Sequence, residues 1–162
     1  MRALAWLCAP TLSSAATVER SEAPRLYTHD ALLTPAECEG LVALAEARLR
    51  PATVHGRTTT SAARTGSQMF LYQNDLVDHP WVLEVMQRLA TWARVPLRHA
   101  EPLQVGRYLP GEKYDLHHDT CHHGENLLHR SATALVYLRA PAAGGATAFP
   151  HAPGPGRAPA RR

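Results

Sequence analysis

The chain has 162 residues, of which 45% are hydrophobic, and it carries a formal net charge of +3. This length suits a single domain with a core of its own. The 17 basic residues are spread along the chain, which argues against a nucleic-acid-binding face, and no apolar run is long enough for a membrane-spanning helix.

Residues 1–16 have the pattern of a short secretory signal peptide, because an arginine precedes the apolar residues 3–9 and residues 14–16 are small enough for cleavage. The alternative is a disordered or transit-like leader. A signal peptide predicts the secretory pathway and the lumen of the endoplasmic reticulum, where Cys38 and Cys121 can pair. Their spacing does not show that they meet, and we favour one thiol on a helix and one in a loop.

Two helices are predicted in the first hundred residues. Thr34-Pro35-Ala36-Glu37 is a capping box with proline at the first helical position, and apolar residues at helical spacing continue from it to about Leu49. Pro51 cannot continue that helix. A second amphipathic pattern begins at Pro80 and runs to about Trp92. Both helices are expected to support a site rather than to form one.

Short strands are predicted for much of the remaining chain. The expected strands are Arg25–Leu33, Met69–Tyr72, Leu103–Arg107, Lys113–Asp119, Ala132–Leu138 and Ala146–Phe149. Polar loops are expected at 55–68 and 120–129, and Leu109-Pro110-Gly111-Glu112 has the composition of a turn. The tail, residues 151–162, is too rich in proline for a strand in a central sheet. Helices followed by strands predict an α+β fold with a small barrel or sandwich.

The segment from Tyr114 to Asp119 holds the densest group of reactive side chains. On a regular strand, His117 and Asp119 project from the same face. An imidazole and a carboxylate that face one cavity can provide two ligands of a two-histidine, one-carboxylate iron site, with the third ligand coming from another histidine. This spacing is weak evidence alone, because it occurs by chance in many proteins.

The surrounding motifs make the interpretation specific, because they resemble the catalytic domain of the prolyl 4-hydroxylase family in the family's order. The similarity covers residues 24–150. The matching segments are Arg25-Leu26-Tyr27 with Leu33–Cys38, Arg64–Leu71, Glu101–Tyr108, Gly111–Asp119, Arg130–Leu138 and Gly144–Pro150.

The resemblance implies a fold and a reaction. The implied fold is α+β, with a double-stranded β-helix core of the jelly-roll or cupin-like type behind two supporting helices. The implied reaction is 4-hydroxylation of prolyl residues in a proline-rich peptide or protein. It requires iron(II) as cofactor, 2-oxoglutarate as co-substrate, and ascorbate to rescue oxidised iron.

The resemblance also implies roles for individual residues. His117 and Asp119 are implied to be iron ligands. Tyr108 and Thr147 are implied to bind 2-oxoglutarate, and Arg64 is implied to lie on a loop that closes over the peptide substrate. From the residues alone, Tyr108 and Thr147 fit ordinary strand packing equally well, and Arg64 fits a solvated loop charge.

The family pattern places a second iron-binding histidine and a lysine for 2-oxoglutarate well beyond Pro150, and residues 151–162 match neither. We therefore expect an incomplete core, a C-terminally truncated domain and impaired turnover. Alternatives are an inactive peptide-binding fragment, a fragment that does not fold, and a zinc or nickel site built from the histidines and the cysteine of residues 117–123. The sequence leaves the oligomeric state open.

Overall fold

The structure is a computed structural model that describes residues 16–53, 60–119, 130–152 and 157–158. The fold is mixed α+β, as predicted. Its elements follow in the order β1 (Val18–Glu22), β2 (Arg25–Thr28), α1 (Pro35–Glu46), β3 (Arg50–Pro51), β4 (Ser67–Leu71), α2 (Gln73–Asp78), α3 (Pro80–Ala93), the 3₁₀ turn η1 (Leu97–His99), β5 (Leu103–Arg107), β6 (Thr147–Ala148) and β7 (Arg157–Ala158). The more specific double-stranded β-helix core stays a prediction.

Helix α1 begins at the predicted capping box. The Thr34 hydroxyl accepts a hydrogen bond from the Glu37 amide at 3.2 Å, and the Glu37 carboxylate accepts one from the Thr34 amide at 2.7 Å. Both bonds satisfy backbone donors that a helix start otherwise leaves unpaired. The helix buries Leu41 and Ala45 and ends before Pro51, so this prediction is confirmed.

Helix α3 starts at Pro80, as its amphipathic pattern predicted. It turns Val82, Val85 and Leu89 into the core and ends where Arg94 takes a left-handed conformation, with φ of 57°. Within the described residues, no helix is long and apolar enough to cross a bilayer.

The short helix α2 was not predicted from the sequence, because its six residues carry no apolar periodicity. One local and one distant interaction of Asp75 hold it in place. The Asp75 carboxylate accepts a hydrogen bond from the Tyr72 amide at 2.7 Å and pairs with the Arg48 guanidinium.

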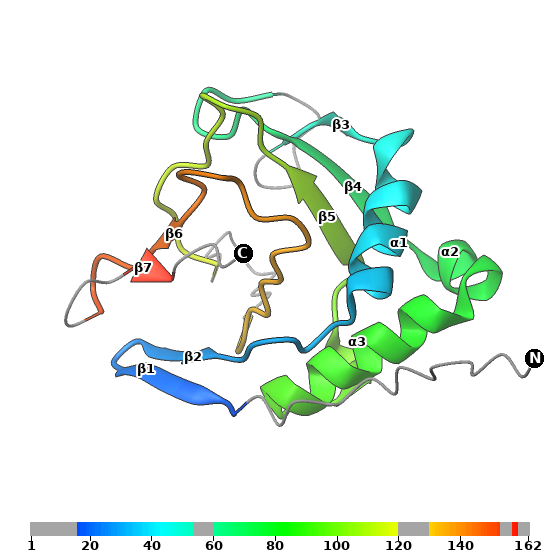
Figure 1. The fold of residues 1–162 in the computed structure, drawn as a ribbon, viewed down its shortest axis with the longest axis horizontal. Helices are drawn as coiled ribbons and strands as arrows, with labels where there is room; N and C mark the ends of the chain where they lie inside the picture. The colour runs from blue at the N-terminus through cyan, green and yellow to red at the C-terminus, as the bar shows by residue number, and fades with distance from the viewer. Residues whose placement is uncertain (1–15, 54–59, 120–129, 153–156, 159–162) are drawn as a thin grey trace, which may run out of the picture.

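A three-stranded antiparallel sheet of order β3-β4-β5 organises the core. Met69 lies opposite Val105, and Leu71 lies opposite Leu103. Figure 1 shows α1 next to β5, with α3 below this sheet. The buried cluster consists of Leu33, Leu41, Ala45, Met69, Leu71, Val82, Val85, Leu89 and Val105.

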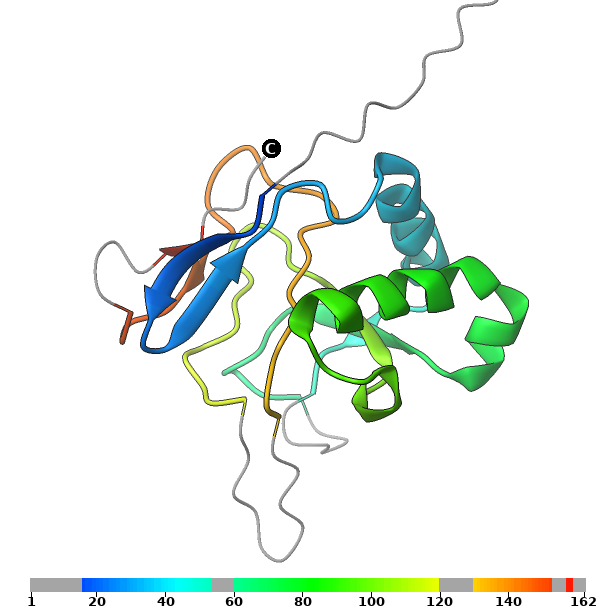
Figure 2. The same ribbon diagram turned by 90° about the horizontal axis from the view of Figure 1, so that it is seen from below.

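Two smaller antiparallel sheets lie apart from α1 and α2. In both Figure 1 and Figure 2, the β1–β2 hairpin and the β6–β7 pair occupy the opposite side of the molecule from α1 and α2. The sequence predicted the strand that starts at Arg25 but not its partner β1. Residues 1–15, which make up most of the predicted signal peptide, lie outside the described residues.

Two predicted strands are wrong as regular elements. The segment 113–119 pairs with another segment at one bridge, between Tyr114 and Arg64, and the segment 132–138 takes no strand conformation. Both have strand-like composition, but strand propensity acts only where a neighbouring strand completes the hydrogen-bond ladder. The predicted turn before the first segment is confirmed, since the Glu112 amide donates to the Leu109 carbonyl at 2.9 Å.

Glu37 joins the start of α1 to α3. Arg88 on α3 donates from both terminal nitrogens to the two Glu37 oxygens at 2.9 Å, and it also donates to the Leu32 carbonyl at 3.2 Å. The Arg88 guanidinium is the main reason that the pKa of Glu37 falls to about 2. The charged carboxylate is thus the form that the fold stabilises.

We expect Glu37→Gln to lower the free energy of unfolding by about 1.5–3 kcal/mol at pH 7, because the variant loses the charge-assisted bonds. The folded-state pKa lies below the unfolded value, so this stabilisation is complete above about pH 4.5 and is lost as the pH falls through about 2. Urea unfolding across this range should show the two proteins converging near pH 2.

The matched control is Glu46→Gln, which removes the same charge from an exposed position on the same helix. It should leave the unfolding free energy nearly unchanged. A Glu37→Gln deficit that is the same at pH 7 and pH 2 would show that the ion pair is not its source.

Candidate metal and co-substrate site

His117 and Asp119 converge, although the segment that carries them is not a regular strand. The His117 Nε2 atom lies 3.2 Å from Asp119 Oδ1. Both side chains are partly open to solvent, with 38% and 33% of their surface exposed. The pair is therefore accessible to an ion from outside.

The hydrogen bond on the far side of the imidazole assigns its tautomer. His117 Nδ1 lies 2.8 Å from the Asp115 carbonyl oxygen. A carbonyl only accepts hydrogen bonds, so Nδ1 carries the proton. In the neutral ring, the Nε2 lone pair then points at the Asp119 carboxylate. Two electron-rich atoms that face each other in this way suit a shared cation, so this pair fits two ligands of a divalent metal site.

Asp119 also contacts two residues for which no role was predicted from the sequence. The Thr133 hydroxyl donates to Asp119 Oδ2, and Arg130 Nη1 lies 3.7 Å from Oδ1. Arg130 also donates to Glu101 at 2.7 Å and holds the pKa of the Glu101 carboxyl below its usual range. Such outer contacts orient a metal-binding carboxylate. The only sequence signal for them was their membership of the family motifs.

Among the residues that the structure describes, no third ligand is found next to the pair. Across the described ranges 16–53, 60–119, 130–152 and 157–158, no group of three His, Cys, Asp or Glu side chains lies close enough together to hold a metal ion. His118 is exposed. Cys121, His122 and His123, which belong to the predicted zinc or nickel alternative, lie outside the described residues.

The predicted co-substrate and substrate residues Tyr108 and Arg64 lie in contact. Arg64 Nε donates to the Tyr108 hydroxyl at 3.0 Å, and Arg64 Nη1 donates to the Thr53 carbonyl at 3.4 Å. Arg64 also lies over the ring of Tyr114, whose own ring stacks on His117. Partial burial raises the pKa of the Tyr114 phenol, so the ring is neutral. Arg64 is thus part of a cluster rather than a solvated loop charge.

Thr147, the other predicted co-substrate residue, contacts Tyr137. The Thr147 amide donates to the Tyr137 hydroxyl at 3.1 Å, and the two hydroxyl oxygens lie 2.7 Å apart. No role was predicted for Tyr137 from the sequence, although it belongs to a family motif. The structure links Thr147 to Tyr137 and does not bring it into the cluster of Arg64, Tyr108 and His117.

Gly66 makes room for Tyr108. A Cβ atom at Gly66 would lie 2.7 Å from the Arg107 carbonyl oxygen and 2.7 Å from the Tyr108 ring. We expect Gly66→Ala to cost roughly 1–3 kcal/mol of unfolding free energy, measured in urea, because either β5 or the Tyr108 ring must move.

Gly106→Ala is the comparison for this variant. A Cβ atom there has its closest neighbour, on the Tyr108 ring, at 3.6 Å, which is an ordinary contact. The Gly106→Ala variant should therefore be as stable as the wild type or slightly more stable. Equal losses from both variants would rule out the steric explanation.

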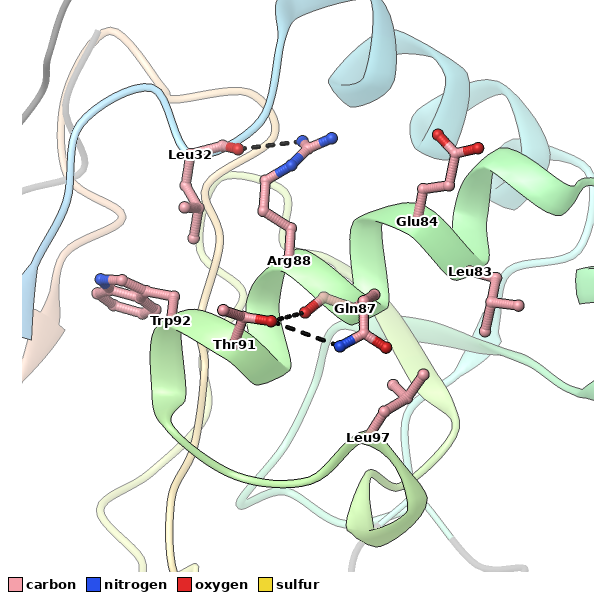
Figure 3. Close-up of a pocket in the computed structure, with 8 residues that line it drawn as sticks. All are labelled: Leu32, Leu83, Glu84, Gln87, Arg88, Thr91, Trp92 and Leu97. Atoms are coloured by element: carbon pink, nitrogen blue, oxygen red, sulfur yellow. Dashed lines mark hydrogen bonds between the residues drawn. The ribbon is translucent and has the colours of Figure 1, made fainter.

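A shallow groove of about 650 Å³ lies along α3, apart from the cluster. Figure 3 shows its lining, which includes Leu83, Gln87, Thr91 and Trp92 from α3 together with Leu32 and Leu97. The Thr91 hydroxyl donates to the Gln87 carbonyl at 2.8 Å. None of the predicted site residues lines this groove.

No family model matches the chain. Several curated proteins of Arabidopsis thaliana do. The chain is 36% identical over 144 residues to "Probable prolyl 4-hydroxylase 4", covering 85% of this chain and 47% of that protein. It is 37% identical over 139 residues to "Prolyl 4-hydroxylase 2", covering 82% and 46%, and 37% identical over 137 residues to "Prolyl 4-hydroxylase 1", covering 80% and 48%.

The chain thus spans about half the length of the curated relatives it matches. The matched half covers about four fifths of this chain and agrees with the family that the ordered motifs indicated. Over this matched part, the chain is similar to prolyl 4-hydroxylases.

Proposed function

We propose that the chain carries part of the catalytic centre of an iron(II)- and 2-oxoglutarate-dependent peptidyl-proline 4-hydroxylase. The observation that carries the proposal is the approach of His117 Nε2 to Asp119 Oδ1 at 3.2 Å, while Nδ1 on the other edge of the ring faces the Asp115 carbonyl at 2.8 Å. The names of the similar proteins supply the reaction class. His117 and Asp119 are then two of the iron ligands.

Bound iron(II), together with 2-oxoglutarate and oxygen, supplies the oxidising chemistry, and ascorbate keeps the iron reduced. The residues of the chain bind and orient. Arg64 donates to the Tyr108 oxygen, which leaves the Tyr108 hydroxyl proton free to donate to a 2-oxoglutarate carboxylate, and the cationic donor strengthens that bond. Thr147, held by Tyr137, provides a further polar group for the co-substrate.

The proposed substrate is a prolyl residue in a proline-rich peptide or protein, with Arg64 on the segment that meets the peptide. The proposed location is the lumen of the endoplasmic reticulum. The signal-peptide pattern of residues 1–16 supports this location.

A second candidate function uses the same two ligands without turnover. Imidazole and carboxylate also suit zinc or nickel, and among the described side chains only two ligands converge. In this alternative the chain is an inactive peptide- or metal-binding module. The two candidates differ in redox chemistry rather than in the residues that hold the metal.

The test is succinate release from 2-oxoglutarate by the purified chain with iron(II), ascorbate and a proline-rich peptide. We expect succinate release that disappears in His117→Ala, because this variant lacks one of the two proposed iron ligands. Metal binding without succinate would favour the inactive alternative. Equal succinate release by the wild type and the variant would remove His117 from the centre and overturn the proposal.

A further inference from the structure

Arg64, Tyr114 and His117 form a stacked column. The rings of Tyr114 and His117 lie 3.8 Å apart between centroids, with 16° between their planes. The Arg64 guanidinium carbon lies 4.5 Å from the centroid of the Tyr114 ring. One face of a phenol ring has room for one such partner, so the imidazole and the guanidinium lie on opposite faces. Tyr114 is the middle layer.

The backbone holds the first two layers in register. Arg64 and Tyr114 form an antiparallel bridge. On either side of it, the Thr65 amide donates to the Lys113 carbonyl at 3.0 Å, and the Asp115 amide donates to the Ala63 carbonyl at 2.8 Å. The segment that carries Arg64 therefore cannot shift without moving Tyr114.

The Arg64 side chain is fixed as well. Its Nε donates to the Tyr108 hydroxyl at 3.0 Å and its Nη1 to the Thr53 carbonyl at 3.4 Å. A cation over the electron-rich face of the phenol ring is attracted to it. These contacts hold Tyr114 in place beside Arg64.

The third layer is the ligand itself. Two contacts at the edge of the His117 ring fix the directions of its nitrogens. Nδ1 faces the Asp115 carbonyl, and Nε2 faces Asp119. They leave the ring free to tilt about the line that joins them. The flat face of Tyr114 removes that freedom.

We propose that Tyr114 and Arg64 are positioning residues for His117, which fix the plane of the imidazole so that Nε2 presents its lone pair to a divalent metal ion. This inference rests on the proposed function, in which His117 is a ligand. It assigns Arg64 a role beyond the peptide binding that the family resemblance implied. An experiment without peptide can separate the positioning role of Arg64 from its role in peptide binding, because positioning acts in the absence of peptide.

The test is a titration of the full chain with Mn(II), without peptide or 2-oxoglutarate, followed by calorimetry. We expect Tyr114→Leu to weaken binding by about 10-fold, the lower end of what outer-shell partners contribute to metal affinity. Arg64→Gln should weaken it in the same direction by a smaller factor. Tyr114→Phe keeps the stacked ring and should bind like the wild type.

Two controls make the result specific. Arg50→Gln removes an exposed arginine whose side chain donates to the neighbouring Leu49 carbonyl at 2.9 Å, and it should leave Mn(II) affinity unchanged. His117→Ala should abolish binding. Unchanged binding in His117→Ala would overturn the proposed function, whereas loss in His117→Ala with full binding in Tyr114→Leu would overturn the column alone.

A second readout tests the column without any metal. The ring current of Tyr114 should shift the His117 ring protons upfield in the NMR spectrum, and their signals are identified by their absence in His117→Ala. Tyr114→Leu should return them downfield, while Tyr114→Phe should not. Unmoved signals in folded Tyr114→Leu would contradict the stack, and an Arg64→Gln variant that alters only the peptide KM would overturn the positioning role of Arg64.

Discussion

Asp119→Asn should weaken Mn(II) binding to the chain by at least about 100-fold, because even outer-shell partners of metal ligands contribute 10- to 100-fold. The substitution keeps the size and shape of the side chain but removes the negative charge that faces His117 Nε2 at 3.2 Å. The neutral amide has one acceptor oxygen in place of two, so a single oxygen cannot both face His117 and accept from Thr133, as the two carboxylate oxygens do. Isothermal titration at fixed pH measures the change.

Asp115→Asn is the matched control, since it removes the same charge two residues earlier. The Asp115 carboxylate is exposed and pairs with Lys113 at 2.7 Å, while its backbone carbonyl, which holds His117, is untouched. We expect its Mn(II) affinity to stay within about twofold of the wild type, the scale on which isolated surface pairs act. Comparable losses in both variants would point to general electrostatics rather than to a ligand at Asp119.

Leu71→Ala should lower the free energy of unfolding by about 2–4 kcal/mol, which is within the range for large-to-small changes at fully buried positions. Leu71 is 1% exposed, at the end of β4, where the sheet meets the apolar faces of α1 and α3. Neighbouring side chains there are themselves buried, so the space cannot close without strain. Chemical denaturation monitored by circular dichroism gives the value.

Val77→Ala provides the comparison on the surface. Val77 lies on α2 and is 69% exposed, so its truncation removes little buried area and should change stability by less than about 0.5 kcal/mol. A Leu71→Ala protein as stable as the Val77→Ala protein would mean that β4 is not part of the cooperative core.

The elements that the sequence predicted well are those whose signals are local. The capping box at Thr34 and Glu37 fixes the start of α1 through bonds that span three residues, and the apolar stripe of α3 needs only helical spacing. The short helix α2 depends instead on Asp75 reaching Arg48, which lies 27 residues away in the chain. No local pattern could reveal that partner.

The two strands that were predicted wrongly also depend on partners that local sequence does not reveal. Residues 132–138 have the composition of a strand, yet a strand is defined by the neighbour with which it pairs, and propensity does not specify that neighbour. Val136 and Leu138 still pack against the core. The apolar character was therefore interpreted correctly, although the conformation was not.

For the site, spacing and family motifs selected five residues, and the structure brings four of them into one neighbourhood through short contacts. Arg64 touches Tyr108, and His117 meets Asp119. The sequence could not show that Tyr114 connects these two pairs, because ring stacking depends on side-chain conformation. Their metal and co-substrate roles stay predictions.

The central position of β4 has a consequence for local unfolding. Its backbone pairs with β3 on one side and β5 on the other, so its amide hydrogens should be among the slowest in the chain to exchange with deuterium. Residues 116–118 lie outside any strand and should open far more readily. Binding of an ion by His117 and Asp119 would then close this segment, and slowed exchange there would report occupancy of the site independently of turnover.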